Sequence, residues 1–76
     1  MKLTAIYEKA TEGGFICWVE EIPEAMSQGD TMDEAKTNLM DALNLVLEYR
    51  REEAENYLAK NKNNATKESI SLAAVS

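Results

Sequence analysis

Apolar and polar residues alternate in two short segments near the start of the chain, residues 2–8 and residues 15–20. A period of two places alternate side chains on opposite faces and is typical of β-strands. Between the two segments, Gly13 and Gly14 can both adopt positive φ, which favours a tight connection. The pattern therefore predicts an antiparallel hairpin.

A third, shorter strand is expected at residues 25–28. Pro23 has no backbone N–H, and we expect it to end the second strand. Gly29 then permits the turn that follows the third strand. The three strands should form an antiparallel meander.

A helix is predicted to begin directly after this turn. Thr31 and Glu34 have the spacing of a capping box, in which the threonine hydroxyl accepts from the Glu34 amide and the Glu34 carboxylate reaches back. Apolar residues then recur at three- and four-residue spacing, which gathers them on one helix face: Met32, Ala35, Leu39, Ala42, Leu43, Val46 and Leu47. We expect this face to lie on the sheet.

The charged run at residues 50–53 interrupts the apolar stripe before Ala54, Tyr57 and Leu58 resume it. The helix can therefore run on past the sheet, or break and restart, and the pattern allows both. An unbroken helix from Met32 to Lys60 would be about 40 Å long, roughly twice a typical strand. Its second half would then overhang the sheet.

The polar residues 61–66 are expected to end the helix, and Ile70, Leu72 and Ala74 alternate with smaller residues in a pattern that predicts a closing strand. The expected order is β-β-β-α-β. This is an α+β, two-layer fold with a three-stranded antiparallel meander, a long helix and a closing strand.

A chain of 76 residues, 45% of them apolar and 29% charged, has the composition of one globular domain, which we place at residues 1–76. A core this small leaves stability marginal, so a homo-oligomer is expected. The sequence has no apolar run long enough for a signal peptide or a membrane span, so we expect a cytoplasmic protein that does not bind membranes.

Few residues are candidates for catalysis or for metal binding. The chain has no histidine, and its one cysteine, Cys17, lies in an apolar run where a buried thiol is expected. Glu20, Glu21, Glu24 and Asp30 crowd the end of the second strand and the next turn, but such acidic residues are usually solvated. We therefore expect no enzyme, no metal site and no cofactor.

The formal net charge of −6 repels nucleic acid and would attract a basic protein partner. With this charge, we expect no direct binding to nucleic acid.

Three segments resemble the pattern of the HicB antitoxin family: a strand ending at proline, a Gly-Asp-Thr turn, and a helix that starts with Glu-Ala. They are residues 14–23 (GFICWVEEIP), 28–35 (QGDTMDEA) and 38–43 (NLMDAL). The likeness covers residues 2–48 and, more loosely, residues 70–75. It implies a partial ribonuclease H-like fold.

The same resemblance implies a function, which is to neutralise a small basic RNA-cleaving toxin, HicA, by covering its active site. Many HicB proteins also carry a DNA-binding domain. Since the residues after Lys67 are strand-like, we expect a stand-alone HicB-like domain without it. The alternative is a structural or regulatory homo-oligomer that has no toxin partner.

Trp18 is the strongest candidate for an interface residue. It shares a strand face with Ile16 and Glu20, opposite Phe15, Cys17 and Val19. If the latter face meets the helix, Trp18 lies on the open face of the sheet, where an indole often marks an interface; core packing of Trp18 is the alternative. The full set of expected protein-interface residues is Ile16, Trp18, Glu20, Tyr57 and Leu58.

Overall fold

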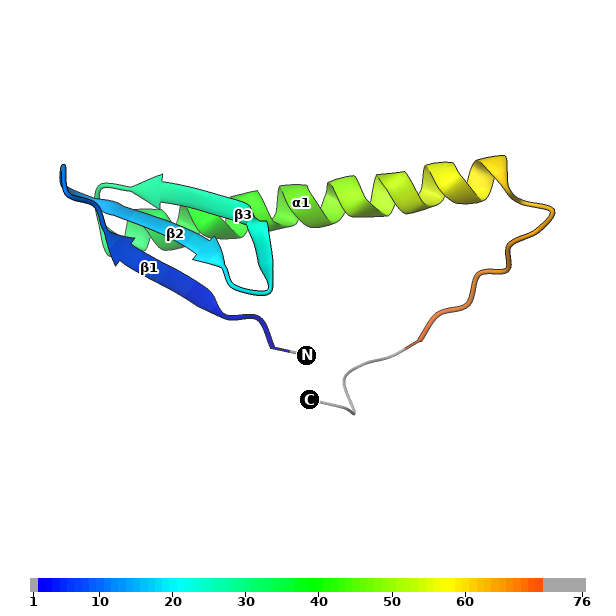
Figure 1. Cartoon of the computed structure of the whole chain (residues 1–76), viewed down its shortest axis with the longest axis horizontal. Coiled ribbons are helices and arrows are strands. Elements are labelled where there is room, and N and C mark those ends of the chain that lie inside the picture. The colour runs from blue at the N-terminus through cyan, green and yellow to red at the C-terminus, as the bar shows by residue number, and fades with distance from the viewer. Residues whose placement is uncertain (1, 71–76) are drawn as a thin grey trace.

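The computed structural model describes residues 2–70, in which a three-stranded antiparallel sheet is covered on one face by one long helix (Figure 1). The elements are β1 (Ala5–Lys9), β2 (Phe15–Val19), β3 (Ile22–Gly29) and α1 (Met32–Lys60), and the strands lie in the order β1-β2-β3. The α+β class, the meander and the helix are thereby confirmed.

The β1–β2 hairpin forms where the paired glycines were expected to allow it. Gly13 and Gly14 both have positive φ, 101° and 76°, and the Ala10 amide donates to the Gly14 carbonyl at 3.0 Å. The register places Tyr7 opposite Cys17 and Ile6 opposite Trp18. Alternate residues of the two strands therefore share a face.

The expectation that Pro23 ends the second strand is wrong. β2 ends at Val19, the chain turns at Glu20 and Glu21, and Pro23 is the second residue of β3. The register between β2 and β3 shifts here, because Val19 pairs with Ile22 whereas Trp18 pairs with Met26. Since β3 is an edge strand, a residue without an N–H is tolerated in this bulge.

The helix begins with the expected cap. The Thr31 hydroxyl accepts from the Glu34 amide at 3.1 Å, and the Glu34 carboxylate accepts from the Asp30 amide at 3.3 Å. One turn later, the Asn38 side chain donates to the Gln28 carbonyl at 2.8 Å. These bonds connect the start of α1 to the end of β3.

The core lies between the sheet and the first half of α1. Phe15, Cys17 and Val19 face the helix, so Trp18 lies on the other face of the sheet. Tyr7, Phe15 and Val46 are partly buried and pack against the core. The buried core residues come from β2, β3 and α1, and they are Cys17, Val19, Ile22, Ala25, Ala35, Leu39 and Leu43.

The helix is unbroken over its 29 residues, which answers the question that the sequence pattern left open. Its last buried residue is Leu43 and Val46 still packs against the core, so residues 47–60 extend beyond the sheet (Figure 1). We call residues 47–60 the overhang. No helix among residues 2–70 is both long enough and apolar enough to cross a membrane.

The chain after α1 folds back along the overhang. Asn61 caps the helix, since its amide donates to the Tyr57 carbonyl at 3.0 Å, and the Lys67 ammonium pairs with the Glu55 carboxylate at 2.9 Å. Residues 65–70 have no regular secondary structure. The expected closing strand begins at Ile70, which is not in a strand, and its remaining residues, 71–76, lie outside the described part of the chain.

Candidate functional site

The face of the sheet that points away from α1 carries a row of apolar side chains. Trp18 in the central strand lies between Ile6 of β1 and Met26 of β3. The next row of the same face contains Ile16, with Glu8 and Gln28 beside it. We call these six residues the open face: Ile6, Glu8, Ile16, Trp18, Met26 and Gln28.

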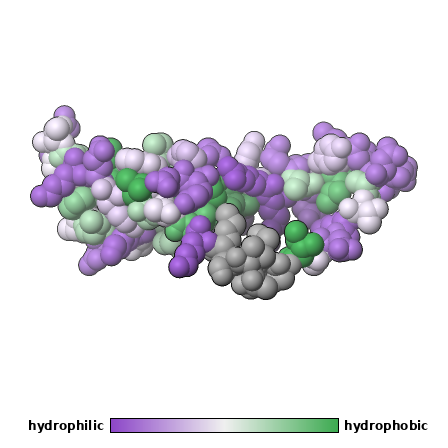
Figure 2. All heavy atoms as spheres, turned by 60° about the horizontal axis from the view of Figure 1, so that its bottom comes forward, coloured by the Kyte–Doolittle hydropathy of each residue, from purple (hydrophilic) through white to green (hydrophobic). Residues whose placement is uncertain are grey.

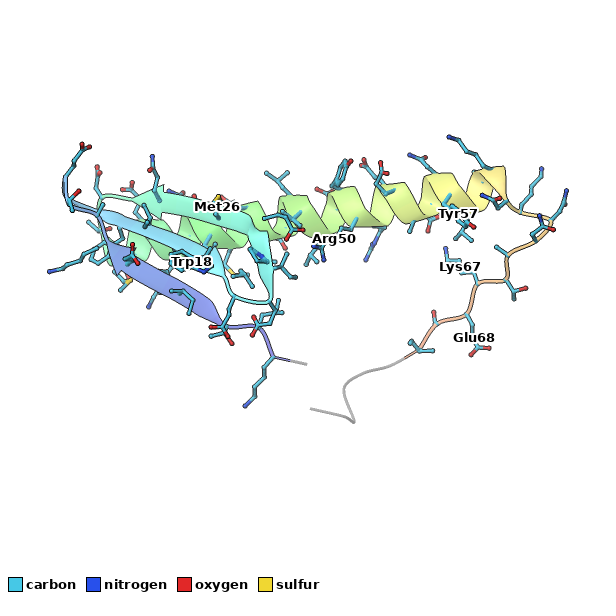
Figure 3. The ribbon with its side chains drawn as sticks, in the orientation of Figure 1. Trp18, Met26, Arg50, Tyr57, Lys67 and Glu68 are labelled. Atoms are coloured by element: carbon cyan, nitrogen blue, oxygen red, sulfur yellow. The ribbon has the colours of Figure 1, made fainter. Side chains whose placement is uncertain are left out.

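The open face is apolar at its centre, and its one charged residue is acidic. Met26 is 63% exposed and Ile16 38% exposed, whereas Trp18 is half-buried between its cross-strand neighbours. Figure 3 shows Trp18 and Met26 on adjacent strands. Because Glu8 is the one charged residue of the open face, this surface offers no positive charge.

Glu20 extends this surface at the end of β2, where it is exposed in the turn and its amide donates to the Thr4 carbonyl at 2.8 Å. Its neighbour Glu21 accepts two bonds from Thr4, from the amide and from the hydroxyl, both at 2.7 Å. These bonds stabilise the ionised form and lower the pKa of the Glu21 carboxyl. The turn beside the open face is therefore held in place by a carboxylate.

Tyr57 and Leu58 lie elsewhere, on the overhang. Tyr57 is 63% exposed and Leu58 is half-buried, and Figure 3 shows Tyr57 far along the molecule from Trp18. The structure thus brings Ile16, Trp18 and Glu20 together, and separates them from Tyr57 and Leu58. The expected interface residues form two surfaces.

Sequence reasoning missed a third exposed apolar group. Leu45 and Tyr49 are 65% and 63% exposed on successive turns of α1, beside a groove that Val46 and the Arg50–Glu24 ion pair also line. Both residues fall outside the apolar stripe that faces the sheet. Large apolar residues off the stripe were the available signal.

The described residues offer little for catalysis. Among residues 2–70, no group of three or more histidine, cysteine, aspartate or glutamate side chains could hold a metal ion. Cys17 is buried, its thiol lies 3.5 Å from the Ala35 carbonyl oxygen to which it donates, and burial raises the pKa of that thiol. The four carboxylates at residues 20, 21, 24 and 30 are all exposed.

Comparison of the sequence with known proteins places the chain in a family. The chain is 48% identical to the UPF0150 protein ssl0738 of Synechocystis over 52 residues, which cover 68% of this chain and 72% of that protein. The chain belongs to the UPF0150 family. No protein-family model matches it, and no solved structure matches it significantly.

A second protein that is similar to this chain has a name that states a function. The chain is 38% identical to Antitoxin HicB 1 of Photorhabdus laumondii over 55 residues, which cover 72% of this chain. The same match covers 36% of the antitoxin. The chain therefore corresponds to about a third of that protein and is similar to HicB antitoxins over this part.

Proposed function

We propose that this chain is an antitoxin-type binding protein that neutralises a small basic HicA-type RNA-cleaving toxin by covering its active site. The observation that carries the proposal is the similarity to Antitoxin HicB 1 over 55 residues. Sequence similarity to an antitoxin also suggests a protein without catalytic activity. We include in the proposal a cytoplasmic location and a single HicB-like domain over residues 1–76.

The fold component of the proposal is a partial ribonuclease H-like domain that a strand near residues 70–75 completes. The observed β-β-β-α order of residues 2–70 supports it, as does the alternation of Ile70, Leu72 and Ala74. Such an arrangement adds a strand to the sheet and leaves the open face uncovered.

The open face, together with Glu20, is the surface that we assign to the partner. Its centre at Ile16, Trp18 and Met26 is apolar, its charged residues are carboxylates, and an aromatic anchor surrounded by apolar contacts is typical of the residues that dominate binding. A basic partner gains from the net charge of −6 through faster encounter. Neutralisation then needs no cofactor, since occlusion of the toxin surface is sufficient.

A growth assay tests the proposal. A small basic HicA-type toxin is expressed in a bacterial host together with the full chain, and growth and RNA integrity are followed. We expect the toxin alone to arrest growth and cleave RNA, and co-expression of the chain to restore both. Continued arrest, with the two proteins eluting separately after purification, would refute the proposed function.

Variants locate the partner surface. Trp18→Ala should weaken the purified complex by about 2 kcal/mol or more, which is roughly 30-fold in Kd. Tyr49→Ala removes a more exposed aromatic side chain from the helix side and should leave Kd unchanged. Equal effects of the two substitutions would exclude the open face as the binding surface.

The charge contribution has its own matched pair. Glu20→Lys should slow association with a basic partner, because the repulsion acts on the encounter. Asp41→Lys makes the same change in charge on the exposed side of α1 and should have a much smaller effect.

A homo-oligomeric structural or regulatory role is the second candidate function, and the exposed overhang is the observation that favours it.

A further inference from the structure

We infer that the overhang is a self-association surface, on which two copies of this chain pair their helices antiparallel. The overhang is about 20 Å long, and no strand lies under it (Figure 1). Its surface in Figure 2 is mainly hydrophilic and is interrupted by a smaller apolar patch. A helix of this kind without a partner would be left to solvent on nearly all sides.

One side of the overhang has the spacing of a helix–helix seam. Leu47, Arg51, Ala54 and Leu58 follow one another at intervals of four, three and four residues, the repeat by which two helices pack along their length. Leu47 is 43% exposed and Leu58 is half-buried. These four residues lie about a quarter of a turn around α1 from the buried Ala35, Leu39 and Leu43, so a second helix can lie beside the sheet.

The charges select a second copy in the antiparallel direction. Arg51 is the cation of the seam, and Glu55 lies one turn further along the same side of α1. Arg50 already pairs with Glu24 of β3, and Glu52 and Glu53 lie on the side of the helix that faces away from the seam. An antiparallel copy centred between residues 52 and 53 places Arg51 of each chain beside Glu55 of the other chain. A parallel copy in register would place arginine beside arginine, which is unfavourable.

The same centre aligns the seam. Leu47 then lies level with Leu58 of the second copy, and Arg51 lies level with the small Ala54 of the second copy, next to the glutamate that follows it. Two leucine pairs and two arginine–carboxylate groups result, related by a two-fold axis, which is the symmetry that most homodimers use. The helix ends where this pairing ends, since Asn61 caps it.

The described part of the returning tail is joined to the overhang by an exposed ion pair. Lys67 pairs with Glu55, and the two side chains are 67% and 55% exposed, so the pair contributes little to stability. The open face is the less suitable surface for self-association. Its charged residue, Glu8, and the adjacent Glu20 are both acidic, so two copies stacked there would bring carboxylates together without a cation.

Charge reversal in the full chain tests the inference without any partner protein. Arg51→Glu should repel its own copy on both sides of the two-fold axis, because it places a carboxylate beside Glu55 of the other chain, and Glu55→Lys should do the same by placing an ammonium beside Arg51. Light scattering and sedimentation over a dilution series should show the unaltered chain as a dimer with a micromolar Kd, as expected for a short interface. Each variant alone should dimerise several-fold more weakly, because two attractive contacts become two repulsive ones.

An equimolar mixture of the two variants should recover the dimer, because the reversed charges attract one another across the seam. Lys36→Glu is the matched control: it makes the same change in charge on the exposed surface of the first half of α1 and should leave Kd unchanged. Far-UV circular dichroism verifies that each variant is folded. A monomeric unaltered chain at hundreds of micromolar, or a mixture no more dimeric than its components, would overturn the inference.

Discussion

Replacing Gly29 with alanine should destabilise the domain, because the last residue of β3 and the first turn of α1 approach closely. A Cβ atom at residue 29 would lie 2.4 Å from the Ala35 amide nitrogen and 2.9 Å from the Ala35 Cα. Both are backbone atoms within the helix, so they cannot rotate away. The helix or the strand end must shift to accommodate the methyl group.

The magnitude follows from two opposing effects. Forced shifts of packed backbone cost about 1–3 kcal/mol, whereas alanine restricts the unfolded chain and returns about 0.4–1 kcal/mol. The net loss should be about 1–2 kcal/mol, out of a total stability of about 4–11 kcal/mol for a chain of this length. The melting temperature should fall by roughly 5–15 °C.

Urea unfolding, followed by Trp18 fluorescence and far-UV circular dichroism at one protein concentration, measures this loss. Gln28→Ala is the control, because the Gln28 side chain is exposed and the carbonyl that Asn38 binds is retained. Its midpoint should be unchanged. A Gly29→Ala midpoint equal to that of the unaltered chain would mean that α1 does not approach β3 this closely in solution.

Three further outcomes are expected. Thr31→Ala should lower the free energy of unfolding by about 1 kcal/mol in the same urea assay, because the Thr31 hydroxyl accepts from a backbone amide at the helix start that would otherwise have no partner. An unchanged midpoint would place the helix start elsewhere. Cys17 should resist alkylation in the folded chain and react once urea unfolds it, because burial hides the thiol and raises its pKa; equal rates in both states would contradict its burial. The pKa of the Glu21 carboxyl is lowered in the folded state, so its contribution to stability is present above the ordinary glutamate pKa and is lost as the pH falls through the lowered value. Thr4→Val should raise that pKa in an NMR titration, and an unshifted carboxyl resonance would show that the Thr4 hydroxyl does not bind it.

The hairpin and the helix start could be predicted because their signals are local. Gly13 and Gly14 permit the positive φ angles of the connection, and Thr31 and Glu34 supply the cap within one turn. Pro23 could not be placed correctly in the same way. The rule that proline ends a strand fails at an edge bulge, and a single sequence does not reveal which strand is at the edge.

The continuity of α1 could not be predicted for a related reason. The apolar period stops at residues 50–53 because the sheet no longer lies beneath them, not because the helix ends. Arginine and glutamate are good helix formers, and the helix runs through them. Hydrophobic periodicity indicates which residues are buried, so an exposed helical segment leaves no signal in it.

The candidate surfaces were predictable to the same extent. Alternation along β2 correctly separated Trp18 and Ile16 from Cys17 and Val19, since the period of a strand fixes its faces. It could not show that Tyr57 lies apart from Trp18, because that separation depends on how far an unbroken helix carries the chain. Leu45 and Tyr49 were missed because they do not belong to the stripe that packs on the sheet.

The position of the two proposed surfaces has a consequence for stoichiometry. The open face points away from α1, whereas the seam lies on the overhang, beyond the sheet, so neither covers the other. A dimer joined through the overhang would keep two open faces free, and each could bind one basic partner, giving a 2:2 assembly. Trp18→Ala should then weaken partner binding without changing the mass of the free protein, and Arg51→Glu should give a 1:1 complex of nearly unchanged affinity. Loss of partner binding in Arg51→Glu would show instead that both copies contribute to one binding site.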